Sequence, residues 1–277
     1  MQESLIIPEN HPRAESLRVR ERLVECLRKG IVVEQGLIAH GRGEAFDYLL
    51  GERTTVYARE AIRASVAIML LAEHPVVSVN GNVACLCAGD VVRLASLLNA
   101  RIEVNLFYRS YEREKAIEML LKEHGAHTVY GVGDRASMSI PELMSERRRV
   151  DRDGIYSADV VLVPLEDGDR TEALVRMGKK VIAVDLNPLS RTARSATITI
   201  VDNITRAMPL MVETARELKN AARDRLNGIV KSFSNARNLE GSLAMIRSGV
   251  ADRGRGGDDI TLDSRGKQVV GVMDDDG

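Results

Sequence analysis

The sequence predicts an α/β fold in which helices flank a mostly parallel sheet, with a helical segment at the amino terminus. Three short runs rich in Val and Ile, at 160–163, 181–184 and 198–201, are apolar on both faces, which is typical of buried parallel strands. Between the first two runs, residues 170–177 suit one short helix that Gly178 closes. Strand, helix and strand in this order form the repeating unit of parallel α/β sheets.

Helices dominate the amino-terminal part of the chain. Residues 13–29 place apolar side chains at helical spacing before Gly30, and Arg20 falls inside the apolar stripe. Either a snorkelling side chain or a surface ion pair would account for Arg20 there, and the sequence leaves both open. A further helix is predicted to begin at Glu44, and a long one covers 57–73.

A Gly-Arg-Gly triplet precedes Glu44. Gly41 and Gly43 flank Arg42, and two glycines would free the backbone so that the arginine approaches a phosphate closely. Most such triplets are ordinary turns, and His40 beside this one is more often structural than catalytic. The triplet by itself therefore indicates a phosphate site only weakly.

Strand and helix patterns alternate through the rest of the chain and extend the sheet. The run that starts at Pro75 ends in Asn80-Gly81-Asn82, where Asn-Gly can simply mark a hairpin turn. Residues 138–153 are polar and rich in Arg without a clean period, which indicates a flap or an excursion with solvated charges. The remaining predicted strands are 102–107 and 128–132, and the remaining helices are 89–98, 112–123, 205–219 and 226–246.

We expect one α/β domain over residues 1–252, whose helical amino-terminal part spans about 1–74. The 277-residue chain is 44% hydrophobic, enough to bury a sizeable core. From residue 253 to 277 the composition turns to Arg, Gly and Asp, and a loose tail is expected there.

Composition also limits which classes of partner and which cellular compartment are expected for the protein. The 39 basic and 40 acidic side chains nearly balance and aromatics make up only 3%, so nucleic acid is not an expected partner. The apolar run 64–72 is too short to cross a bilayer and the amino terminus lacks a signal pattern, so we expect a cytoplasmic protein away from membranes. Cys26, Cys85 and Cys87 are expected to be reduced, structural thiols.

Polar clusters follow the three buried strands, and ligands bind at the carboxyl edge of open α/β sheets. After the second strand, Asp185 is placed to accept ribose hydroxyls, Asn187 can donate and accept, and Ser190 is a reasonable helix N-cap that would aim amide donors at an anion. Arg191, Thr192 and Arg194 would neutralise that anion. An ordinary capped loop is an equally good interpretation, since the chain has neither a Walker A motif nor a Gly-x-Gly-x-x-Gly fingerprint.

Two further clusters lie at the same predicted edge. Asp202 and Asn203 follow the third strand and would lie beside Asp185. Glu166, Asp167 and Asp169 follow the first strand and could hold Mg²⁺ through water, although a solvated acidic turn is the favoured interpretation.

Several long segments in one order together resemble the archaeal phosphopantothenate synthetases, also called 4-phosphopantoate–β-alanine ligases. They are GLIAHGRGEAFDYLLGE, HPVVSVNGNVA, EVNLFYR and ADVVLVPLEDGDRTEALVRMGKKVIAVDLNPLSRTARSATITIVDNITRA. The resemblance covers about residues 7–218. It implies a Rossmann-like homodimer in the route to coenzyme A that joins 4-phosphopantoate to β-alanine with ATP and Mg²⁺ through an acyl-adenylate.

The resemblance also implies which residues act. Arg42 and Arg191 would be catalytic, and no protein ligand to a metal is implied. The nucleotide would be held by Arg20, Arg42, Asp185, Leu186, Asn187, Arg191, Thr192, Asn203 and Ile204. The segment 138–150 lacks the family's short Pro-Gly-Leu loop, so the contacts to the acid substrate are left open.

A different class of function uses the same residues: a nucleotide-binding regulatory protein that senses ATP or AMP without turnover. Arginines on three separate segments argue against it, because binding alone would not need so many charges around the phosphates.

Overall fold

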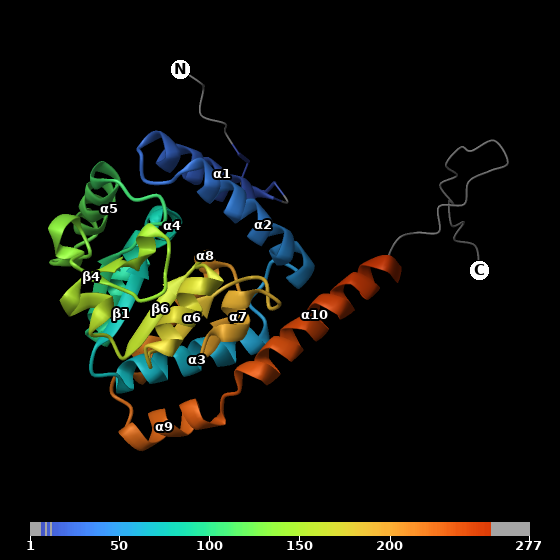
Figure 1. Ribbon diagram of the computed structural model, residues 1–277. Helices are drawn as coiled ribbons and strands as arrows, with labels where there is room; N and C mark the ends of the chain where they lie inside the picture. The colour runs from blue at the N-terminus through green and yellow to red at the C-terminus, as the bar shows by residue number, and fades with distance from the viewer. Residues whose placement is uncertain (1–6, 9, 12, 256–277) are drawn as a thin grey trace, which may run out of the picture.

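The structure is a computed structural model that describes residues 7–8, 10–11 and 13–255. A six-stranded sheet with strand order β3-β2-β1-β6-β7-β8 forms its centre, and every neighbouring pair is parallel. Figure 1 shows this sheet enclosed by helices, as the sequence predicts. The strands are β1 (Pro75–Val79), β2 (Arg101–Val104), β3 (Val129–Tyr130), β6 (Val160–Pro164), β7 (Lys180–Val184) and β8 (Ile198–Ile200).

The strand order reverses between β1 and β6. From β1 the chain moves outward to β2 and β3, whereas from β6 it moves outward on the other side to β7 and β8. Such a reversal opens a crevice at the carboxyl ends of the two central strands, where open α/β sheets bind ligands. The topology therefore marks the β1–β6 junction as the centre of any site.

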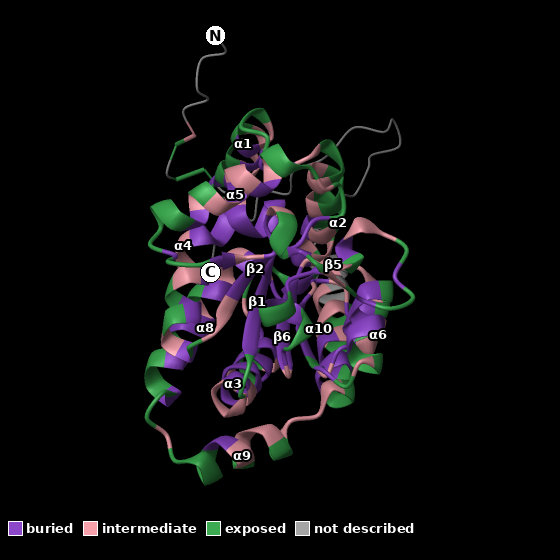
Figure 2. Ribbon diagram, turned by 60° about the vertical axis from the view of Figure 1, so that its left-hand side comes forward, coloured by how far each residue is buried: buried purple, intermediate pink, exposed green. Residues whose placement is uncertain are grey.

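The two-faced apolar strands are explained by two cores, one on each side of the sheet. Leu162 and Ile182 belong to a large core together with residues of α1, α3, α4, α5 and α8. Val161 and Val181, their neighbours in the chain, point the opposite way into a smaller core. The predicted runs at 160–163, 181–184 and 198–201 are confirmed as buried parallel strands. Figure 2 shows the first of them, β6, in purple at the centre of the molecule.

Most predicted helices are confirmed to within a few residues. The α-helices are α1 (Ala14–Arg28), α2 (Glu34–Leu50), α3 (Val56–Leu71), α4 (Gly81–Leu98), α5 (Tyr111–Glu123), α6 (Gly168–Arg176), α7 (Arg191–Ser195), α8 (Ile204–Leu218), α9 (Arg223–Ser232) and α10 (Asn235–Arg255). The predicted helix 226–246 is wrong as a single element, because the chain leaves helical geometry at Phe233 between α9 and α10.

The Gly-Arg-Gly triplet is not a turn, and the predicted helix start at Glu44 is wrong. α2 begins ten residues earlier, at Glu34, and runs through Gly41 and Gly43 without a break. A Cβ on Gly43 would lie 3.5 Å from a Leu186 methyl, and one on Gly36 would lie 2.4 Å from the Asn82 side chain. Glycines in α2 therefore allow this helix to approach the loops of the sheet edge closely, rather than allowing the chain to turn.

Asn80-Gly81 is likewise a helix start and not a hairpin. Asn80 is the N-cap of α4, and its side chain accepts a hydrogen bond from the amide of Val83. α4 is apolar and long enough to pass for a membrane span by composition, but 61% of it is buried within this fold. It is the central helix of the large core.

The Arg-rich segment is an excursion between β3 and β6, as predicted. It contains an antiparallel pair, β4 (Met138–Ser139) and β5 (Arg149–Val150), and three short helical turns, η1 (Gly133–Arg135), η2 (Glu146–Arg148) and η3 (Arg152–Tyr156). Its apolar side chains complete the smaller core. The expectation that all of its charges are solvated is wrong at Arg147, which is only 7% exposed.

The expectation of three reduced cysteines is also wrong. Cys26 of α1 and Cys85 of α4 form a disulfide across a sequence separation of 59 residues, and Cys87 is buried and free. Sequence spacing does not reveal this pair, because only the packing of α1 on α4 brings the two sulfurs together. At the other end of the chain, α10 extends past residue 252 to Arg255, and the rest of the predicted tail lies outside the described residues.

Candidate functional site

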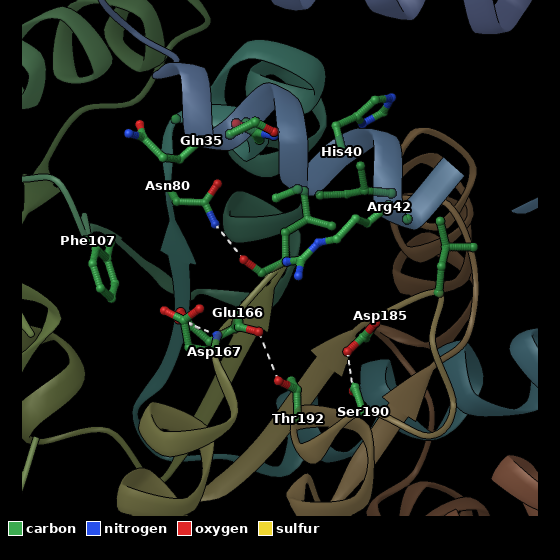
Figure 3. Close-up of a pocket in the computed structure, with 18 of the residues that line it drawn as sticks. Gln35, His40, Arg42, Asn80, Phe107, Glu166, Asp167, Asp185, Ser190 and Thr192 are labelled. Atoms are coloured by element: carbon green, nitrogen blue, oxygen red, sulfur yellow. Dashed lines mark hydrogen bonds between the residues drawn. The ribbon is translucent and has the colours of Figure 1, made fainter. Parts of the chain in front are cut away.

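A pocket of about 640 Å³ lies at the carboxyl edge of the sheet, within the size range of ligand sites in proteins. Its floor is made by the loops that follow β1, β2, β6, β7 and β8, and α2 crosses above it (Figure 3). Eight of the nine nucleotide residues implied by the resemblance line this pocket: Arg42, Asp185, Leu186, Asn187, Arg191, Thr192, Asn203 and Ile204. These eight residues come from three separate stretches of the chain, and the fold brings them around one cavity.

The loop after β7 is held by its own polar side chains. The Asp185 carboxylate accepts hydrogen bonds from the Asn187 amide (2.9 Å) and the Ser190 hydroxyl (2.5 Å). Ser190 is the N-cap of α7, as predicted, because its hydroxyl accepts the amide of Ala193 (2.9 Å). Burial raises the pKa of Asp185, and these two donors oppose that rise. Asp185 therefore shapes the loop as well as facing the pocket.

Thr192 and Arg191 connect this loop to the one after β6. The Thr192 hydroxyl donates to the Glu166 carbonyl (2.9 Å), while Arg191, which is exposed, pairs with Glu172 (2.9 Å). A Cβ on Gly168 would come within 2.5 Å of the Arg191 Cβ, so only glycine fits at this first residue of α6. The Arg191–Glu172 pair is solvated and weak, which leaves the guanidinium able to turn toward an anion.

The end of β8 is tied to α2 through buried charges. Asn203 is the N-cap of α8 and also donates to the Asp47 carboxylate (2.9 Å). Arg206 binds both Asp47 (2.5 Å) and Asp202 (2.7 Å), and Thr54 donates to Asp202 (2.6 Å). Asp202 is thus a structural carboxylate in this network, whereas Asn203 lines the pocket.

α2 contributes a cation that has no hydrogen-bond or ion-pair partner among the residues the structure describes. Arg42 is exposed and extends from α2 over the cavity in Figure 3, and its charge opposes part of the rise that burial causes in the pKa of Asp185. His40 also lines the pocket, and burial lowers its pKa. Arg20 does not line the pocket but pairs with Glu44 of α2 (2.7 Å), which decides between the two predicted interpretations in favour of an ion pair.

Asn80 joins the two central strands, β1 and β6, at the switch point, where the strand order reverses. Its amide nitrogen donates to the carbonyls of Pro164 and Leu165, both at 3.1 Å, while its amide oxygen caps α4. Leu165 adopts a left-handed conformation with φ of 54°, unusual for a non-glycine residue. This turn aims the Glu166 side chain inward beneath the pocket.

The pocket has a second half, over β1 and β2, that sequence reasoning missed. It is lined by Gly81, Asn82, Leu106, Phe107, Tyr108, Arg113 and Arg147. Arg113 donates to the carbonyls of Ile31 (3.1 Å) and Tyr108 (2.5 Å) and has no carboxylate partner among the described residues. The available signal was Asn-Gly-Asn after a buried strand and before a helical pattern, but Asn-Gly can also simply mark a hairpin turn.

The interpretation of the acidic cluster after β6 as a solvated turn is wrong at Glu166 alone, because Asp169 is exposed. Glu166 is buried and pairs with both Arg147 and Arg170, while Asp167 remains half exposed. Across the described residues, no group of three His, Cys, Asp or Glu side chains could hold a metal ion. A divalent cation would therefore need oxygens from a bound ligand in addition to Asp167.

Comparison with known proteins identifies the family. Residues 57–249 match the family model for phosphopantothenate/pantothenate synthetase. The chain belongs to this family. A 4-phosphopantoate–β-alanine ligase of Thermococcus kodakarensis is 56% identical over 241 residues, which are 87% of this chain and 92% of that protein.

Other synthetases of the family are similarly close. The ligase of the same name from Thermococcus onnurineus is 54% identical over 91% of this chain and 96% of its own length, and that of Methanosarcina mazei is 53% identical over 87% and 94%. Residues 57–249, which the family model matches, include the loops of both halves of the pocket but not α2.

Proposed function

We propose that the protein is an ATP-dependent ligase that joins 4-phosphopantoate to β-alanine and releases AMP and pyrophosphate, in the route to coenzyme A. The observation that carries this proposal is the combination of relatives of that name, more than half identical over most of the chain, with a large pocket where the strand order reverses. A site of this kind, with unpaired and half-buried guanidinium groups, suits substrates that bring several negative charges together.

The two halves of the pocket have different donors and accordingly different substrates. ATP lies over β7 and β8, held by Asp185, Leu186, Asn187, Arg191, Thr192, Asn203 and Ile204, with Arg42 above; Arg20 acts through Glu44 to position α2. 4-Phosphopantoate lies over β1 and β2, where Arg113 and the amino end of α4 face the cavity. The reacting carboxylate and the α-phosphate then meet at the switch point.

The chemistry needs positioned cations and no nucleophilic side chain. The pantoate carboxylate attacks the α-phosphorus of ATP, pyrophosphate leaves, and an acyl-adenylate forms. Arg42 and Arg191, the catalytic residues of this proposal, stabilise the charge that develops on the phosphate oxygens. The neutral amine of β-alanine then attacks the acyl carbon, loses a proton, and expels AMP.

Mg²⁺ fits the site only as a partner of the nucleotide. Asp167 is the half-exposed carboxylate at the pocket, and the other nearby carboxylates are engaged by arginines or by loop donors. Asp167 would hold the ion together with phosphate oxygens, which is the usual mode for this metal. There it would neutralise the charge of the pyrophosphate.

A test of the function is product analysis after mixing the protein with ATP, Mg²⁺, 4-phosphopantoate and β-alanine. We expect AMP and 4′-phosphopantothenate in equal amounts. ADP formation would contradict the adenylate route, and nucleotide binding without any product would favour the regulatory alternative. We further propose a cytoplasmic homodimer, which sedimentation of the purified protein tests for oligomeric state.

A further inference from the structure

A buried charge cluster lies directly beneath the pocket and has no role in the chemistry above. Glu166, whose side chain is 2% exposed, pairs with Arg147 on one oxygen and Arg170 on the other. Arg170 is fully buried and also bonds the Ser78 hydroxyl of β1 (3.3 Å). The cluster therefore joins β1, α6, the loop after β6 and the excursion.

Arg147 is the arginine of this cluster that lines the pocket, beside Glu166. It comes from η2 of the excursion, and it is the one pocket-lining residue contributed by that whole segment within the described chain. Its backbone is fixed as well as its side chain, because the fully buried Asn105 donates to the carbonyls of Arg147 (3.1 Å) and Arg149 (3.0 Å). A side chain held at both ends is preorganised for a ligand.

The positive charges of the cluster are incompletely balanced. Two guanidinium groups pair with one buried carboxylate, and the buried Glu103 of β2 also acts on Arg170 through its charge. Burial of both arginines keeps water from compensating them. Asp167 lies 3.3 Å from the Arg147 Nε, but that nitrogen makes no hydrogen bond and Asp167 is 45% exposed, so this pair is loose. An anionic ligand that entered the pocket could replace Asp167 beside Arg147.

We propose that Arg147 is a substrate-binding residue for the anionic acid substrate, and that Glu166 and Arg170 are positioning residues that hold its guanidinium at the switch point. The excursion between β3 and β6 then has a purpose beyond packing: it delivers this one charge to the half of the pocket over β1 and β2. This inference rests on the proposed ligase function for the identity of the acid.

The test compares Arg147→Gln with wild type in steady-state kinetics and in ATP binding by calorimetry. Glutamine keeps a donor toward Glu166 but removes the charge. We expect the KM for 4-phosphopantoate to rise on the order of 10- to 100-fold, the effect of losing one charge-assisted hydrogen bond, while the Kd for ATP stays within about twofold. Glu166→Gln, which leaves the Arg147 charge but loosens it, should raise the same KM by a smaller factor.

Arg148→Gln is the matched control. Arg148 is the next residue of η2, its side chain is 47% exposed, and it makes only a loose contact with Glu146 at 3.6 Å. The KM for 4-phosphopantoate and the Kd for ATP of this variant should both equal those of wild type.

Several outcomes would overturn the inference. A folded Arg147→Gln protein with an unchanged KM for 4-phosphopantoate would do so, and so would equal losses of ATP and acid binding, which would indicate a general collapse of the site. If Arg147→Gln does not fold, Arg147→Lys decides instead: it keeps the charge but lacks the planar fork, so an unchanged KM would again count against the inference. Absence of turnover by wild type itself would instead refute the proposed function, whatever Arg147 does.

Discussion

Asp185 uses both carboxylate oxygens within its own loop, whereas Arg42 donates no hydrogen bond to any described residue. Replacing Asp185 would therefore disturb the loop as well as any contact with a ligand, and the two losses could not be told apart. The Arg42 side chain projects from α2 over the pocket and supports no other element of the described chain, so its replacement tests ligand binding alone.

Arg42→Ala should lower kcat/KM for ATP on the order of 10- to 100-fold and leave the melting temperature unchanged, since the lost interaction exists only with a charged ligand. Steady-state kinetics and thermal unfolding measure the two quantities. Arg53→Ala is the control, because Arg53 is also exposed but does not line the pocket. A folded Arg42→Ala protein with wild-type kcat/KM would show that the nucleotide lies elsewhere.

Glu103 makes stability depend on pH. This carboxyl is fully buried on β2, where burial raises its pKa to about 7 although it accepts the amides of Ile155 and Asp151. Because the folded pKa lies above the ordinary value of 4.5, the folded state binds the proton more tightly. The contribution of this proton to the stability of the folded state is complete below about pH 4.5 and is lost as the pH rises to about 7.

We expect this group to reduce the free energy of unfolding by on the order of 2–3 kcal/mol between pH 4.5 and 7.5. Urea titrations across this pH range give the free energy of unfolding of wild type and of Glu103→Gln. The contribution of Glu103 is the change with pH in the difference between these two free energies. The variant is less stable throughout, because glutamine can accept only one of the two amides, but the deficit should shrink as the pH rises. A deficit that grows with pH would contradict the raised pKa.

A disulfide and a close backbone contact hold the amino-terminal helices against the central helix of the core. α1 and α4 are joined by the Cys26–Cys85 disulfide, and the turn after α1 lies on the start of α4, where a Cβ on Gly81 would come within 2.2 Å of the Ile31 carbonyl. α2 follows directly and carries Arg42. The disulfide therefore fixes the helical part of the pocket to the central helix of the core.

Replacing both Cys26 and Cys85 by Ala should lower the free energy of unfolding by on the order of 2–4 kcal/mol, because the bond restricts a long loop in the unfolded chain. Reductant should lower the melting temperature of wild type but not of the double variant. Thiol titration of the unreduced, unfolded wild type should find one free thiol, that of Cys87. Three free thiols would refute the bond.

α10 closes the edge of the sheet at β8, where a strand would otherwise present unpaired groups. The Asn235 side chain accepts the Thr199 amide (2.8 Å) and donates to the carbonyls of Ala193 and Ala196, both at 3.1 Å. Asn238 donates to the Thr199 carbonyl (2.8 Å). Side chains of a helix thus replace the backbone bonds of a neighbouring strand.

Asn235→Ala should destabilise the fold by on the order of 1–3 kcal/mol, because it leaves the buried Thr199 amide without an acceptor. Chemical denaturation measures the loss. Glu240→Ala, an exposed change on the same helix, should alter stability by less than about 0.5 kcal/mol. Equal stability of the two variants would mean that α10 does not protect this edge.

At the scale of the whole molecule, the pocket spans both halves of the sheet. The first half of the proposed reaction, which uses ATP and 4-phosphopantoate, should therefore be testable without β-alanine. With ATP, Mg²⁺ and 4-phosphopantoate but no β-alanine, labelled pyrophosphate should exchange into ATP, because adenylate formation needs no amine. Arg191→Ala should lose this exchange together with the complete reaction, since in the proposed mechanism the same guanidinium stabilises the charge of the adenylation step.

The complete reaction without this exchange would mean that pyrophosphate stays bound until the amine arrives. In a parallel reaction with labelled ADP in place of labelled pyrophosphate, exchange of label into ATP would instead indicate attack on the γ-phosphate. Arg53→Ala serves again as the control variant.

The sequence by itself determined the parallel sheet, the two-faced burial of 160–163 and 181–184, the capped loop at Ser190 and the family of the chain. These follow from local rules: apolar periodicity, capping chemistry and the order of strands and helices. The site edge was also predictable, because the carboxyl ends of parallel strands converge.

Only the tertiary structure decided the rest. The Cys26–Cys85 bond, the continuous α2 through Gly41 and Gly43, and the buried place of Arg147 all depend on contacts between segments far apart in the chain. An arginine in a polar run has the same local pattern whether it is solvated or paired beneath a pocket. Burial and pairing are set by which elements pack together, and no local pattern contains that information.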